Sequence, residues 1–131
     1  MPGTITNRTI FGGSTTGGAG EFPISLSIDG APSVVEVLVP AGSKLVISDI
    51  LPAHNGGLSL IMWRLQQADN GVGFYDIGLY PVRGLTNTSI YSPKPGIVVN
   101  GDQGPDVRFR ARVLTPGATP VAITLRGYTE N

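Results

Sequence analysis

The chain contains no cysteine, which excludes a disulfide framework, a thiol nucleophile and a thiolate metal site. Charged residues make up 14% of its 131 residues, against about 25% in typical soluble domains. Nine basic residues balance nine acidic ones, so no overall field attracts nucleic acid or an acidic membrane surface. The sequence has no apolar run of about 20 residues and no secretion signal at its start. We therefore expect no nucleic-acid partner and no membrane insertion.

Residues that carry catalysis or bind metal are equally scarce. His54 is the single histidine, and the Gly-rich stretch around it predicts an exposed loop residue and not the base of a Ser-His-Asp triad. Asp69, Asp102 and Asp106 do not have the spacing of a calcium loop, and Asp102 and Asp106 are predicted to bound a turn. A pair of carboxylates for glycoside hydrolysis is a spatial arrangement that sequence does not reveal. We expect no enzyme activity, no metal and no cofactor.

The pattern that is present is that of short strands. Nineteen Gly and eleven Pro interrupt stretches of helical length, and apolar residues alternate with polar ones from residue 23 onward. Segments of this kind recurring every ~8–12 residues are typical of a sandwich or barrel, and eight strands make a jelly roll. We predict one all-β domain over 23–131, a jelly-roll-like β-sandwich of about eight strands. The expected strands are 23–28, 33–39, 44–51, 58–67, 72–80, 88–91, 96–99, 106–114 and 120–128. Asp29-Gly30 is predicted to form a turn, and Asp69-Asn70-Gly71 predicts a hairpin of 58–67 with 72–80.

Residues 1–22 are predicted to form a flexible arm. Their glycines, concentrated between residues 12 and 20, are typical of a flexible coil because they have little apolar surface to bury. No Gly-Lys-Ser/Thr follows these glycines, so they do not match a phosphate-binding loop. Ile10 and Phe11 form a small apolar pair ahead of them, and we predict that the two side chains anchor the arm on a partner.

Four arginines are expected on the outside of the sandwich. In the segment VRFRARV (107–113) the odd positions face the core, which places Arg108, Arg110 and Arg112 in a row on the outer face. Arg126 is expected to lie outside in the last strand. The row is either a solvated basic stripe or a docking face, since arginine is enriched at interfaces. Nucleic-acid contact is disfavoured because no exposed aromatic residue is interleaved with these arginines.

The segment 58–65 has two apolar faces. Leu58, Leu60 and Met62 lie on one side, and Ile61, Trp63 and Leu65 lie on the other. Each sheet of a sandwich has one covered side, so the second side needs another cover, from a loop or from another subunit. This pattern favours a homo-oligomer whose interface uses these six residues.

The segments VPAGSKLVISDI (39–50) and VAITLRGY (121–128) resemble the framework of small jelly-roll proteins of bacteriophage virions, and head decoration (cement) proteins are the nearest group. The resemblance covers about residues 33–128 in pattern. It implies a structural protein made in the host cytoplasm and located on the capsid surface. It also implies a homotrimer that binds the major capsid protein from outside and staples neighbouring subunits with an extended arm.

A carbohydrate-binding module is the alternative, because the same sandwich also carries sugar sites. Such sites use exposed aromatic side chains. Trp63 falls in an apolar strand and is expected to be buried, so Tyr75, Tyr80 and Tyr91 are the candidate platforms. An enzyme would need a deep pocket holding two carboxylates, or His54 beside a Ser and an Asp.

Overall fold

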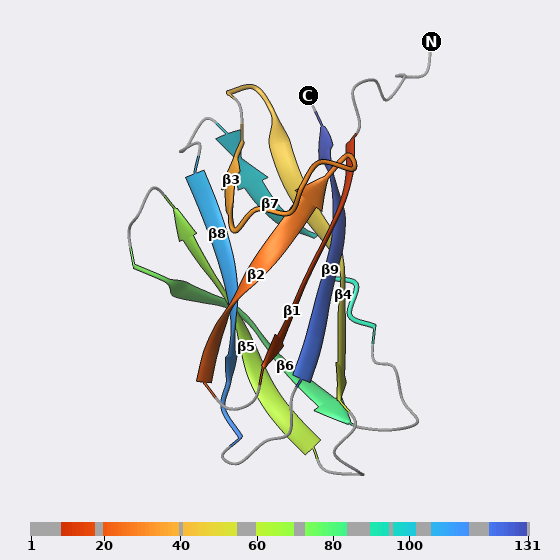
Figure 1. Ribbon diagram of the computed structural model, residues 1–131, viewed down its shortest axis with the longest axis vertical. Coiled ribbons are helices and arrows are strands. Elements are labelled where there is room, and N and C mark those ends of the chain that lie inside the picture. The colour runs from red at the N-terminus through yellow and green to blue at the C-terminus, as the bar shows by residue number, and fades with distance from the viewer. Residues whose placement is uncertain are drawn as a thin grey trace.

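The fold was examined in a computed structural model, which describes residues 9–17, 20–39, 41–54, 60–69, 73–83, 90–94, 96–101, 106–115 and 121–130 (Figure 1). In these ranges the chain forms nine strands, and the predicted all-β, jelly-roll-like sandwich is confirmed. No helix in the described ranges is long and apolar enough to span a membrane. The strands are β1 (Thr9–Gly17), β2 (Gly20–Ile28), β3 (Glu36–Leu38), β4 (Lys44–His54), β5 (Leu60–Asp69), β6 (Tyr75–Arg83), β7 (Ile97–Asn100), β8 (Asp106–Val113) and β9 (Val121–Glu130).

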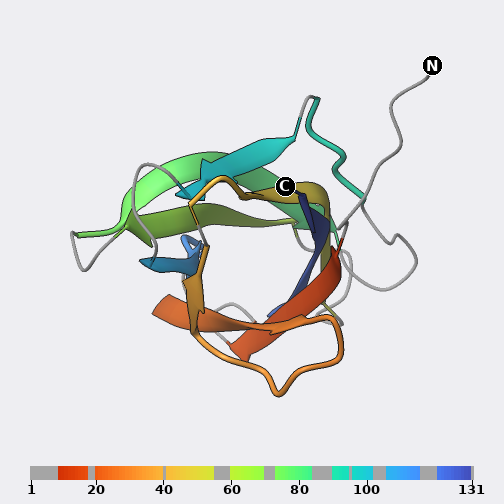
Figure 2. The same cartoon turned by 90° about the horizontal axis from the view of Figure 1, so that it is seen from above.

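The strands form one curled antiparallel sheet in the order β6-β5-β8-β2-β1-β9-β4-β7, with β3 paired to β8. β2 makes the corner between two layers, because its residues 20–24 pair with β8 and its residues 25–28 pair with β1. Where β2 leaves β8, β3 takes its place against residues 106–108. We name the two layers sheet A (β1, β9, β4 and β7) and sheet B (β3, β8, β5 and β6). Viewed end-on, the sheet curls back on itself (Figure 2).

The predicted flexible arm over 1–22 is wrong for the residues described in that range. Residues 9–17 form β1, which lies between β2 and β9 and pairs with β9 along its whole length. Residues 20–22 begin β2, so the predicted domain boundary at 22/23 falls inside a strand. Residues 1–8 lie outside the described ranges. Glycine at position 13 allows β1 and β2 to pack closely, since a Cβ on Gly13 would overlap the Leu26 side chain and lie 2.6 Å from the carbonyl oxygen of Ser25.

The core lies between the two sheets and follows the predicted alternation. The odd positions of β8 and of β9 up to Gly127 are buried, while the even positions of both strands are partly or fully exposed. Phe11, at the centre of the range predicted to be mobile, is 2% exposed and packs into this core. The largest fully buried side chains are Trp63, Phe109, Ile24, Leu26, Leu45, Ile47, Ile50, Leu65, Ile123 and Leu125.

Two predicted turns can be compared with the structure. Asp29 (φ 54°) and Gly30 (φ 77°) both have positive φ, as a type I′ hairpin turn requires. The predicted hairpin of 58–67 with 72–80 is confirmed by the pairing of β5 with β6. Of its predicted turn, 69–71, the structure describes Asp69, the last residue of β5. The strand expected over 88–91 is replaced, where it is described, by a single bridge between Tyr91 and Ile50.

Candidate functional site

The outer face of sheet B carries the predicted row of arginines. Arg108 and Arg112 are exposed, Arg110 is half-buried, and all three alternate with buried residues of β8. Each of them contacts a carboxylate of its own chain: Arg108 lies 2.7 Å from Glu36, and Arg110 and Arg112 lie 3.0 and 3.8 Å from Glu21. These carboxylates come from β3 and β2, far away in sequence. Two carboxylates of the same chain thus balance most of the charge of the three arginines.

Further polar contacts extend from this row onto β5 and β6, and we name the whole set of ion pairs and hydrogen bonds the charged network of sheet B. Arg64 forms an ion pair with Asp76, and Gln66 Nε2 donates a hydrogen bond of 2.7 Å to the same carboxylate. These two contacts hold the pKa of Asp76 below its ordinary value of 3.8, with the Gln66 hydrogen bond as the larger cause. Arg110 Nε donates to Gln66 Oε1 at 2.6 Å, and its guanidinium lies 4.0 Å from the centre of the Phe74 ring. The arginines of this face are thus held by internal contacts.

Asp106, which was expected to close a turn and to begin the strand 106–114, is the first residue of β8 and shares a hydrogen bond with Glu36. Burial raises the pKa of Asp106, and the hydrogen bond to Glu36 and the charge of Glu36 raise it further. The hydrogen bond from Arg108 and its positive charge lower the pKa of Glu36. The two carboxyl groups therefore share one proton more readily than two separate acids would, and Arg108 balances the remaining charge.

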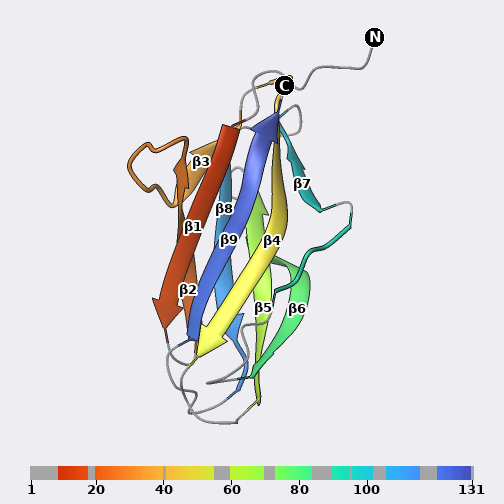
Figure 3. The same cartoon turned by 90° about the vertical axis from the view of Figure 1, so that its right-hand side faces the viewer.

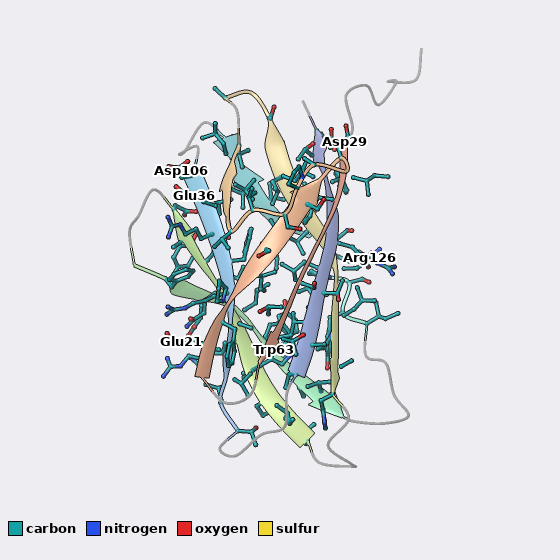
Figure 4. The ribbon with its side chains drawn as sticks, in the orientation of Figure 1. Glu21, Asp29, Glu36, Trp63, Asp106 and Arg126 are labelled. Carbon is teal, nitrogen blue, oxygen red and sulfur yellow. The ribbon has the colours of Figure 1, made fainter. Side chains whose placement is uncertain are left out.

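The outer face of sheet A has a different composition. We name it the serine–threonine face, because serine and threonine are its most frequent residues. It is formed by β2, β1, β9 and β4, which lie side by side (Figure 3). Arg126 projects from it on the side opposite to Glu21, Glu36 and Asp106 (Figure 4). The face consists of Ile10, Gly12, Ser14, Thr16, Ser25, Ser27, Asp49, Leu51, Ala53, Ala122, Thr124, Arg126 and Tyr128.

Two of the predicted partner-binding residues meet on this face. Ile10 and Arg126 line one shallow depression of about 400 Å³, together with Asp49 and Tyr128. Ile10 is 75% exposed. The Asp49 carboxylate accepts hydrogen bonds from Ser92 Oγ at 2.6 Å and from Ser48 at 3.3 Å, whereas Arg126 forms no ion pair within the part of the chain that the structure describes.

Phe11, the other predicted anchor, does not reach a partner surface. Its side chain points inward from β1, opposite Gly127 of β9, while the side chain of Ile10 points outward. Successive side chains of a strand point to opposite faces of the sheet. Ile10 and Phe11, which were predicted to anchor together on a partner, therefore lie on opposite faces. The prediction that Phe11 binds a partner is wrong.

The residues of β5 that were predicted to form an oligomer interface also alternate between the core and the outer side of the sheet. Ile61, Trp63 and Leu65 are buried in the chain's own core, so their assignment to an interface is wrong. Trp63 is buried, as predicted. Leu60 is exposed and Met62 is half-buried on the outer side. Leu58 lies outside the described residues. The outer side of this strand is not apolar along its length, because the next outward residue is Arg64, which belongs to the charged network of sheet B through its ion pair with Asp76.

His54 is not the exposed loop residue that the Gly-rich stretch predicted. It is the last residue of β4, pairs with Val121 of β9 and is 8% exposed. The strand extends three residues beyond its predicted end at 51 because β9 offers backbone partners up to that point. In the described ranges, no group of three His, Cys, Asp or Glu side chains is placed to hold a metal ion.

The three candidate tyrosine platforms have different environments. Tyr80 and Tyr91 are half-buried, their ring centres lie 5.0 Å apart, and Tyr80 packs on Trp63 at 5.3 Å. Tyr75 is 47% exposed at the start of β6. It lines a cleft of about 200 Å³ between β5, β6 and β7, in which Asp69 is the carboxylate. From the sequence, Asp69 was considered for calcium and as the start of a turn. Its place beside Tyr75 follows from the hairpin register, in which Gln67 pairs with Tyr75 and Asp69 lies two residues further along β5.

No family model, no curated protein and no solved structure matches this chain.

Proposed function

We propose that this chain is a virion structural protein that docks on the outside of a bacteriophage capsid through its serine–threonine face and stabilises the shell. The contrast between the two faces is the observation that supports this proposal. Arg108, Arg110 and Arg112 are engaged by carboxylates of their own chain. Ile10 and Arg126 lie together in a shallow depression, with Asp49 and Tyr128, on a face that is rich in short hydroxyl side chains.

The chemistry of this face suits a protein partner. Serine, threonine and glycine have little side-chain freedom to lose on docking, and the centres of protein interfaces are depleted of charge. Complete burial of Ile10 would contribute about 1.5–3 kcal/mol. The planar guanidinium of Arg126 can pair with a carboxylate through two parallel hydrogen bonds. The expected partner surface, on the major capsid protein, is flat and largely uncharged, with one acidic side chain opposite Arg126.

The charged network of sheet B is poorly suited to docking. Covering it would remove water from several ion pairs that are half exposed in the free protein, and such desolvation often costs more than the pairs return. On a decorated capsid this face would remain in contact with solvent. The balanced charges would then keep the surface of the particle hydrated without giving it a strong net charge.

The homotrimer remains a prediction from the family resemblance, and the structure narrows its possible interface. Ile61, Trp63 and Leu65 already contribute to the core and are not available to a second subunit. Among the members of the predicted set that the structure describes, Leu60 is the exposed apolar side chain. A trimer would therefore rest on residues around Leu60 and not on the whole strand.

Binding to capsids tests the proposal directly. Expanded capsids of the phage that encodes the chain are mixed with the purified protein, and the bound fraction is measured by co-sedimentation. Arg126→Glu and Ile10→Asp should each weaken binding at least about tenfold. The first places a negative charge opposite the acidic side chain expected on the partner, and the second places a charge against its largely uncharged surface. Arg112→Ala, on the opposite face, is the matched control and should bind as the unmodified chain does. Absence of binding by the unmodified chain, or equal losses with Arg112→Ala, would contradict the proposal.

A further inference from the structure

The seam between β6 and the edge of sheet A is closed along only part of its length. Tyr91 exchanges two backbone hydrogen bonds with Ile50 of β4 (2.8 and 2.9 Å), and its hydroxyl donates to the carbonyl oxygen of Pro81 on β6. Tyr91 thus joins the two edges at this point. At the start of β6 the edges separate, and β7 faces Tyr75 and Ile77 across the cleft of about 200 Å³.

The walls of this cleft combine a polar end with an apolar side. Ile77, Ile97 and Val99 supply the apolar side. At the polar end, the Asp69 carboxylate accepts a hydrogen bond of 2.9 Å from Gln67 Nε2 and one of 2.8 Å from the Tyr75 hydroxyl. Two donors on separate strands fix the orientation of this acceptor before any ligand arrives.

The half-exposed ring of Tyr75 lies beside this carboxylate. Burial of its hydroxyl, the hydrogen bond to Asp69 and the negative charge of Asp69 raise the pKa of Tyr75 to about 12. The phenol therefore stays protonated at neutral pH and keeps its hydrogen bond to the carboxylate. An aromatic face and a fixed acceptor are thus presented side by side.

We propose that this cleft binds a small neutral polyhydroxylated ligand, a single sugar ring, with its hydroxyls donating to Asp69 and its C–H face packed on Tyr75. This site is independent of the docking face, because its residues come from β5, β6 and β7 and do not belong to the serine–threonine face. Among the described residues, no Lys, Arg or His lines the cleft, which disfavours phosphate or carboxylate ligands.

The size of the cleft limits the ligand to one ring. Its volume of about 200 Å³ is below the range of about 300–1,000 Å³ that holds drug-sized molecules. A ligand with about a dozen non-hydrogen atoms at ordinary efficiency binds with a dissociation constant in the millimolar range. Such affinity is useful where many copies of a protein display the site together, since linked sites gain strongly in avidity.

The test uses the full chain labelled with ¹⁵N and the methyl glycosides of glucose, galactose and mannose, each added to about 10 mM. Saturable amide shifts confined to residues 67–69, 75–77 and 97–100 with at least one glycoside are the expected result. Glucosamine is added as a cationic comparison. If it binds more than about tenfold tighter than every neutral sugar, or if no sugar shifts these amides, the proposal is overturned.

Two variants examine the residues that would hold the ring. Asp69→Asn keeps the shape of the side chain but removes the charged acceptor, and it should weaken binding about tenfold. Tyr75→Ala removes the aromatic face and should abolish measurable binding. Leu79→Ala, an exposed position on β6 outside the cleft, is the matched control and should leave the affinity unchanged. Thermal melting of each variant separates lost binding from lost folding, and unchanged affinity in a folded Asp69→Asn variant would refute the assignment.

Discussion

Replacing Phe11 with Ala tests whether β1 belongs to the fold or is an arm. The ring is 2% exposed and lies over Gly127, which has no side chain to fill the space that Ala would leave. Burial and the resulting cavity place the loss for Phe→Ala at about 3–5 kcal/mol, and we expect about 4 kcal/mol here. This is a large part of a total stability of about 5–15 kcal/mol. A flexible arm would instead predict no change.

Urea unfolding followed by the fluorescence of Trp63, the single tryptophan, measures this loss because Trp63 is fully buried in the folded chain. With a slope of about 1.5 kcal/mol/M, a loss of about 4 kcal/mol lowers the unfolding midpoint by about 2.5 M. Ile10→Ala is the matched control, since the neighbouring side chain is exposed and should change stability by less than about 0.5 kcal/mol. Deleting residues 1–22 should abolish the transition. A Phe11→Ala variant as stable as the Ile10→Ala control would refute the assignment of β1 to the core.

Two further predictions concern packing and pH. Gly127→Ala should destabilise the fold by at least about 1–3 kcal/mol, because a Cβ there would overlap the carbonyl oxygen of Val46 and lie 2.6 Å from the Phe11 ring; Gly12→Ala, with open space around it, should be near neutral in the same urea assay. The lowered pKa of Asp76 stabilises the fold above its ordinary value of 3.8, and this contribution disappears as pH falls through the lower folded-state pKa. Asp76→Asn should therefore melt earlier than the unmodified chain at neutral pH, with a smaller difference at about pH 3; an equal difference at both pH values would contradict this.

The strand pattern was predictable wherever one face of a strand meets the core. Alternation in 106–114 and 120–128 predicted β8 and β9 to within two residues at each end, because burial of every second side chain is a local signal. The Asp29-Gly30 turn was predictable for a similar reason, since few residue pairs accept positive φ at both positions. The outward position of Arg108, Arg110 and Arg112 followed from the same period of two.

β1 was not predictable, because its residues have the composition of a linker. TIFGGSTTG contains two large apolar side chains, and flexible coils are rich in the same small residues. In the structure Gly13 and Gly17 face Leu26 and Phe22, whose side chains occupy the space where a Cβ would lie. The side chains that require glycine at these positions thus lie on another strand, β2, and the contact exists only in the assembled sheet.

The sequence alone determined that the chain is an all-β sandwich with its arginines outside, because strand period, turn residues and composition are local properties. Only the tertiary structure decided which of those arginines are paired. Glu21 and Glu36 reach the row on β8 because β2 turns the corner between the sheets and β3 continues where β2 leaves. Arg126 lies on the opposite sheet, beyond the reach of those carboxylates. Ion pairing acts over a few ångströms, and the chain folding that brings residues so close is not a property of any single segment.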